Sequence, residues 1–153
     1  MTSDGIAGGV SLTEGKWAGW AAWSDPHPDT FLQAIGRGYM RSDAPGKALI
    51  GLETRSSHRN RLDTLHGGFL AAFADHAYFG GLWAMGHIGQ VNGVTIDLSM
   101  QYLGAGRVGP DLLAEVEMLR ETGRLFFLRM LITQDGQPVA ASTATIRKVS
   151  SPR

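Results

Sequence analysis

The segment that most restricts the fold of this chain is TLHGGFLAAFADHAYFGGLWAM, residues 64–85. From Phe69 to Met85 its ionisable side chains, Tyr78 apart, are Asp75 and His76, so it has no polar face for water to cover. We therefore predict a helix that is buried on nearly every side. A carboxylate taken out of water costs roughly several kcal/mol unless it is paired, hydrogen-bonded or protonated. Asp75 therefore needs a specific reason to be there, and catalysis is one such reason.

Residues on both sides of this segment alternate in the manner of strands. Period-two patterns cover residues 46–56, 93–103, 111–121, 124–134 and 137–149. Asp135-Gly136 is a hairpin turn signal between the last two runs. One buried helix followed by an antiparallel meander predicts an α+β fold in which the sheet curls around the helix.

Residues 1–45 are predicted to form a helical extension in front of a domain at residues 46–150. Ser11 stands three residues before Glu14 at a capping-box spacing, and tryptophans follow at steps of three, at 17, 20 and 23. These indoles would cover a core or a subunit contact, or form a lid over an apolar ligand. Residues 29–35 predict a second short helix that ends before Gly36.

Composition excludes several classes of function. The 153 residues suffice for one domain with a real core, and the 14 basic and 14 acidic residues give no reason to expect a nucleic-acid partner. The chain has no cysteine, which rules out a thiol nucleophile, disulfides and thiolate zinc ligands, and fits a cytoplasmic location. No apolar run predicts a membrane-spanning segment, and the N-terminus lacks the order of a signal peptide.

The histidines give no metal-binding pattern. His58, His66 and His76 lack the spacing of a known ligand motif, so no metal is predicted. His76, next to Asp75, is expected to serve as an interface or packing residue.

The run NRLDTLHGGFLAAFAD, residues 60–75, followed by GVTIDLSMQYL, resembles the hotdog-fold acyl-CoA thioesterases. The resemblance is to the branch of the phenylacetate-degradation and 4-hydroxybenzoyl-CoA thioesterases, and it spans roughly residues 46–148. It implies a sheet wrapped around a central helix, an acyl-CoA substrate, no cofactor, and a homodimer or a homotetramer built as a dimer of dimers.

The sequence around His66 explains how such a site could work. Gly67 and Gly68 open the helix, where backbone N–H groups lack partners and point along the positive end of the helix dipole. Such donors suit the oxygen of a thioester carbonyl as its charge grows. The alternative is that His-Gly-Gly is only a tight helix entry with His66 as its cap.

Asp75 lies eight residues beyond Gly67, about 12 Å along a helix at 1.5 Å per residue. One chain cannot bring both groups to the same carbonyl carbon. If Asp75 is catalytic, the oxyanion donor must come from a second subunit, so the mechanism requires a dimer. Asp75 would be a general base or a nucleophile, unless it is a buried structural acid.

The resemblance assigns further residues. Asn60 would orient the loop or hold the attacking water, and its alternative is a turn former. Thr95 occupies the position of a hydroxyl near that water, and its alternative is a solvent-facing strand threonine. Some relatives carry a small polar residue one turn after the carboxylate, where this chain has Phe79. Phe79 and Gly68 are predicted to contact the substrate, and the aromatic side chains of the segment suit a medium-chain or aromatic acyl group.

The prediction is an enzyme that hydrolyses acyl-CoA without metal or nucleotide cofactor. One alternative is a hotdog hydratase or dehydratase, which the interval between His66 and Asp75 disfavours. The other is a non-catalytic sensor that binds acyl thioesters.

Overall fold

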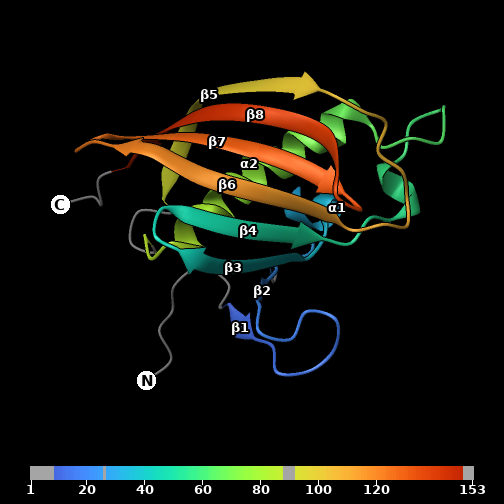
Figure 1. Ribbon diagram of the computed structural model, residues 1–153, viewed down its shortest axis with the longest axis horizontal. Coiled ribbons are helices and arrows are strands. Elements are labelled where there is room, and N and C mark those ends of the chain that lie inside the picture. The colour runs from blue at the N-terminus through green and yellow to red at the C-terminus, as the bar shows by residue number, and fades with distance from the viewer. Residues whose placement is uncertain (1–8, 26, 88–91, 150–153) are drawn as a thin grey trace.

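A computed structural model describes residues 9–25, 27–87 and 92–149. Within these residues, eight antiparallel strands form one sheet in the order β1-β2-β3-β4-β6-β7-β8-β5. In Figure 1 the sheet faces the viewer and the long helix α2 runs behind it. The elements are β1 (Val10–Ser11), β2 (Ala21–Trp23), α1 (Leu32–Ile35), β3 (Gly38–Ala44), β4 (Lys47–Leu52), a 3-10 turn (Ser56–His58), α2 (Gly67–Ala84), β5 (Gly93–Tyr102), β6 (Leu112–Glu121), β7 (Leu125–Gln134) and β8 (Gln137–Lys148).

The core lies between the sheet and α2. On β7 every second side chain is buried, from Phe126 through Leu128 to Ile132, because alternate residues of a strand face the helix. Half of the residues of α2 are buried as well, including Phe73 and Tyr78. The predicted α+β hotdog arrangement, a sheet wrapped around a central helix, is confirmed. No helix in the described parts of the chain combines the length and the apolar character that crossing a membrane requires.

The strand order differs from a simple meander at β5. β6, β7 and β8 are joined by hairpins, and Asp135 and Gly136 both have positive φ in the expected tight turn. β5 instead pairs with β8 and forms the edge of the sheet, seen at the top of Figure 1. Alternation along a strand does not specify which strand it pairs with. The sequence therefore predicted β5 as a strand but not its position beside β8 at the edge of the sheet.

The prediction of a helix through the three tryptophans is wrong. Residues 10–23 form the short antiparallel pair β1 and β2, with a turn between them in which Gly15 and Gly19 have positive φ. Trp17 stacks on Tyr39 with ring centroids 4.3 Å apart, and its indole N–H donates to Glu53 at 2.9 Å. These contacts with the sheet outweigh the helical spacing. The second expected helix is present as α1.

The tryptophans therefore lie on different faces of the sheet. Trp17 covers Gly51 of β4, and a Cβ there would overlap its ring. Trp23 lies on the helix side, where its ring fills the space that a Cβ on Gly80 of α2 would need. β3, within the expected extension, pairs with β4 and so belongs to the same sheet.

Candidate active site

Asp75 lies half-buried in the middle of α2 and accepts a hydrogen bond from β5. The donor is the hydroxyl of Thr95, 2.6 Å from Oδ1 of Asp75. Thr95 faces the helix because its partner on β8 is the buried Ile146, and directly opposed residues of an antiparallel pair share a face. The interpretation of Thr95 as a solvent-facing residue is therefore wrong.

The beginning of α2 holds the other expected groups. His66 is the N-cap, and its Nδ1 accepts a hydrogen bond of 2.9 Å from the N–H of Gly68. That N–H is occupied, so Gly68 does not offer the donor that was expected of it. The N–H of Gly67 has no partner among the described residues. In a neutral His66 ring, acceptance at Nδ1 leaves the proton on Nε2, where it can be donated.

Asn60 shapes the loop that leads to His66. Its Oδ1 accepts from the N–H groups of Leu62 and Thr64 at 2.8 and 3.2 Å, and its Nδ2 donates to the Thr64 hydroxyl at 2.9 Å. These bonds fit both a turn former and a residue that orients the loop, and a contact of Asn60 with the attacking water stays a prediction. It lies near the start of α2, away from Asp75 of the same chain, as the helix length requires.

His58 supports the same loop and was not identified from the sequence. Its carbonyl accepts the N–H of His66 at 2.8 Å, and its buried ring stacks on Phe69 with centroids 3.8 Å apart. Its Nε2 lies 3.1 Å from the carbonyl oxygen of Ala34 at the end of α1. Burial lowers the pKa of His58. A single histidine in a polar loop carries no pattern that predicts this role.

A pocket of about 660 Å³ opens beside Asp75. One wall is a stripe of α2, and the opposite wall comes from the segment between β2 and the end of α1. Its lining consists of Trp23, Ser24, Asp25, His27, Phe31, Leu32, Ile35, Ala72, Asp75, His76, Phe79, Gly80, Trp83 and Asn92. Asp75 and Phe79 therefore share one cavity, whereas Gly67, His66 and Asn60 are not among its lining residues.

His76 of α2 lines this pocket and contacts Trp23 at the end of β2. Its ring packs on Trp23 with centroids 4.7 Å apart, and only 9% of the residue is exposed. Burial lowers its pKa to about 4, so the ring is neutral near pH 7. Its Nε2 has no hydrogen-bond partner among the described residues. The prediction of a packing residue is confirmed.

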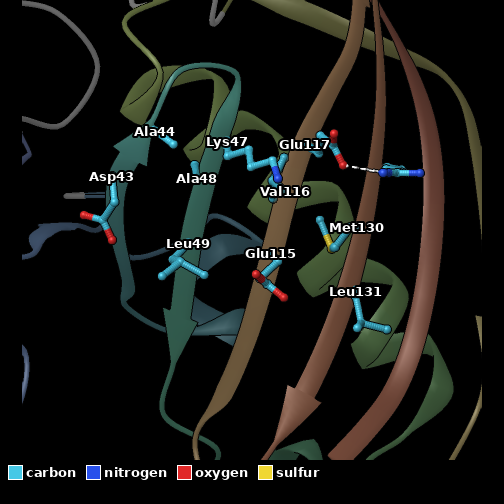
Figure 2. Close-up of a pocket in the computed structure, with 11 residues that line it drawn as sticks. Asp43, Ala44, Lys47, Ala48, Leu49, Glu115, Val116, Glu117, Met130 and Leu131 are labelled. Carbon is cyan, nitrogen blue, oxygen red and sulfur yellow. Dashed lines mark hydrogen bonds and ion pairs between the residues drawn. The ribbon is translucent and has the colours of Figure 1, made fainter. Parts of the chain in front are cut away.

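A second hollow, of about 480 Å³, lies on the face of the sheet turned away from α2. Figure 2 shows its lining on β3, β4, β6 and β7, including Lys47 and Glu115. The ion pair between Glu117 and Arg129 crosses it, with 2.6 Å between charged atoms. No residue of α2 or β5 lines it, so the sheet separates it from Asp75. Within residues 9–25, 27–87 and 92–149, no three His, Asp or Glu side chains are grouped to hold a metal.

Comparisons with known proteins agree with this architecture. The family model of the thioesterase superfamily matches residues 62–141. Human acyl-coenzyme A thioesterase 13 is 26% identical over 103 residues, which cover 67% of this chain and 72% of the relative.

Two solved structures are also similar. Thioesterase superfamily member 2 of zebrafish has a TM-score of 0.69 at 26% identity, covering 80% of this chain and 90% of the other. A mutant of the phenylacetic acid degradation protein PaaI from Thermus thermophilus has a TM-score of 0.65 at 28% identity, covering 79% and 100%.

Proposed function

The chain belongs to the thioesterase superfamily, and on that premise we propose that it hydrolyses an acyl-CoA thioester to a carboxylic acid and free CoA. The observation that carries the proposal is the hydrogen bond between Thr95 and Asp75 at a pocket with aromatic walls. A carboxylate oriented by a hydroxyl beside such a pocket has the geometry of a general base or a nucleophile. The name of the human relative supports acyl-CoA as the substrate.

In the general-base route, Asp75 takes a proton from water as the water oxygen bonds to the thioester carbon. The carbonyl oxygen gains the negative charge, the carbon–sulfur bond then breaks, and the CoA thiolate takes the proton back from Asp75. In the nucleophilic route, an oxygen of Asp75 bonds to that carbon, CoA leaves, and water hydrolyses the anhydride. Neither route uses a metal or a cofactor. After a single turnover in ¹⁸O-labelled water, label in Asp75 identifies the nucleophilic route with cleavage of the anhydride at the Asp75 carbon, because the general-base route labels the product acid alone.

The N–H of Gly67 would stabilise the carbonyl oxygen, and it would come from a second copy of the chain. Asp75 and Gly67 are eight residues apart on one continuous helix, about 12 Å along its axis. Two antiparallel helices would place each carboxylate beside the partner's helix N-terminus. The exposed apolar side chains of Val94 and Ile96 on edge strand β5 support burial against another copy. We extend the proposal to a dimer, or a dimer of dimers.

The pocket lining supports an uncharged acyl group of medium length or with an aromatic ring. Trp23, Phe79 and Trp83 supply aromatic surface. Of the described residues that line the pocket, none is lysine or arginine, whereas Asp25 and Asp75 are acidic. A carboxylate at the far end of the acyl group would meet no lysine or arginine among these described residues.

The test is thiol release from short, medium, long and aromatic acyl-CoAs by wild type and by Asp75→Asn. We expect turnover by wild type, a loss of at least about a thousandfold in the variant, and retained acyl-CoA binding. Binding without turnover by wild type would favour a sensor. Hydration of an enoyl-CoA without thiol release would favour a hydratase.

A further inference from the structure

Tyr102, the last residue of β5, contacts the first residue of α2. Its hydroxyl donates a hydrogen bond of 2.9 Å to the carbonyl oxygen of Gly67. Its ring lies close to the glycine, since a Cβ on Gly67 would be 3.4 Å from two ring carbons. The residue is 55% exposed, so burial in the core does not account for its place.

The peptide group between Gly67 and Gly68 is consequently fixed at both ends. Tyr102 binds its oxygen, and Nδ1 of His66 binds its N–H. Two consecutive glycines have more backbone freedom than any other pair of residues. The two hydrogen bonds remove much of that freedom, and the orientation of this peptide limits where the preceding N–H, that of Gly67, can point.

A β-bulge makes this contact possible. Thr95 pairs with Ile146 and Asp97 with Thr145, so Ile96 has no partner in the register. Without the extra residue, positions 95 and 102 would point to opposite faces of the sheet, because side chains alternate along a strand. With it, Thr95 reaches Asp75 in the middle of α2 while Tyr102 reaches Gly67 at its start.

We propose that Tyr102 is a positioning residue that holds the N–H of Gly67 in the direction needed to stabilise the oxyanion. This inference rests on the proposed function, because it presumes that Gly67 supplies that donor. Loss of an interaction that matters only as charge develops lowers kcat and leaves KM unchanged. If Tyr102 merely stabilised the fold, its replacement would lower the melting temperature and would not lower kcat selectively at constant KM.

The test compares thiol release by wild type, Tyr102→Phe and Gln101→Ala. Tyr102→Phe keeps the ring and removes the hydroxyl, whereas Gln101 is the exposed neighbour whose side chain alternates to the other face. We expect about a tenfold lower kcat in Tyr102→Phe with KM within about twofold of wild type. Gln101→Ala should match wild type. The melting temperatures of all three should agree within about two degrees.

A second measurement does not depend on turnover. In the ¹H–¹⁵N spectrum of the protein without substrate, Tyr102→Phe should shift the amide resonances of Gly67 and Gly68 and leave those in the second half of α2 in place. An unchanged kcat would overturn the inference, and so would unchanged glycine resonances, while a loss of activity in Asp75→Asn would leave the proposed function standing. If wild type hydrolyses no acyl-CoA, the proposed function fails and this inference fails with it.

Discussion

The hydroxyl of Thr95 donates to Oδ1 of Asp75 across 2.6 Å, which joins the edge strand of the sheet to the middle of the buried helix. In the proposed mechanism, this contact would orient one carboxylate oxygen and leave the other to act on water or on the thioester. Because Thr95 is on an edge strand and Asp75 lines the pocket, the pair lies where a second copy and a substrate would meet.

Thr95→Val removes this hydrogen bond at almost constant volume. We expect kcat for thiol release to fall about tenfold, the effect of losing one hydrogen bond to a charged group of about 1.5 kcal/mol. Thr95→Ser should recover most of the rate. Thr143→Val, on an exposed position of neighbouring β8, is the control and should behave as wild type. Equal rates in Thr95→Val and wild type would remove Thr95 from the mechanism.

Gly67→Pro tests the oxyanion donor by removing one N–H. Gly67 is the first residue of α2, where proline is well tolerated, and His66 before it has the extended backbone, φ −66° and ψ 132°, that a following proline favours. We expect kcat to fall about 10²–10³-fold with the fold retained, as for the loss of a single oxyanion donor. Gly67→Ala, which keeps the N–H, should lose far less. Similar rates in the alanine and proline variants would show that the fall in kcat comes from hindered steric access and not from the lost N–H.

Mixed dimers test whether the two groups come from different subunits. Asp75→Asn and Gly67→Pro chains, each inactive alone, are co-expressed with different tags and the mixed dimer is purified. If each site takes Asp75 from one chain and Gly67 from the other, one site of the mixed dimer carries both substitutions and the other site carries neither. About half of the wild-type rate per dimer is therefore expected. If each site used groups of one chain only, the mixed dimer would stay inactive.

The buried neutral His76 predicts a pH dependence of stability. Its pKa is about 4 in the folded protein against 6.5 unperturbed, so the unfolded chain binds more protons between these values. The stability that the neutral ring contributes is complete above pH 6.5 and is lost as the pH falls toward 4, up to about 3 kcal/mol. In His76→Phe, unfolding by urea should depend less on pH over this range. His27→Asn, at an exposed position, should retain the wild-type dependence.

A cation placed in the pocket should change its selectivity. Phe31 lines the pocket and is 69% exposed, so arginine is tolerated there. Phe31→Arg should raise kcat/KM for an acyl-CoA with a terminal carboxylate about tenfold relative to the uncharged acyl-CoA of equal length. Phe31→Gln controls for the loss of the ring. An unchanged ratio would place the acyl group elsewhere.

The sequence predicted those parts of the fold in which local pattern and burial agree. The apolar run around Asp75 specified α2, and the alternating runs specified β4 to β8, because each strand buries or, in β5, half-buries one set of side chains. The pattern failed at Trp17, where stacking on Tyr39 and a bond to Glu53 outweigh a helical spacing. Both partners lie far along the chain, and a local pattern does not include them.

The candidate site was predicted in outline only. Thr95 and Tyr102 face the same side of β5 because the register shifts at Ile96, and no feature of the run GVTIDLSMQYL shows where the alternation is interrupted. The supporting roles of His58 and Tyr102 depend on contacts with Ala34 and Gly67 that only the folded chain brings together. The N–H of Gly68 was expected to be free, and the side chain of His66 occupies it.

The wall of the pocket opposite α2 is built from residues 23–35, whereas the thioesterase family model begins at residue 62. If the proposed acyl group binds in this pocket, one of its walls is encoded in a stretch of the chain separate from Asp75 and Thr95, while Phe79 and Trp83 of α2 form part of the other wall. Substitutions between Trp23 and Ile35 can alter which acyl group fits without touching Asp75, Thr95 or the start of α2. An exchange of this stretch among relatives would be a direct route to enzymes with new acyl preferences on an unchanged catalytic frame.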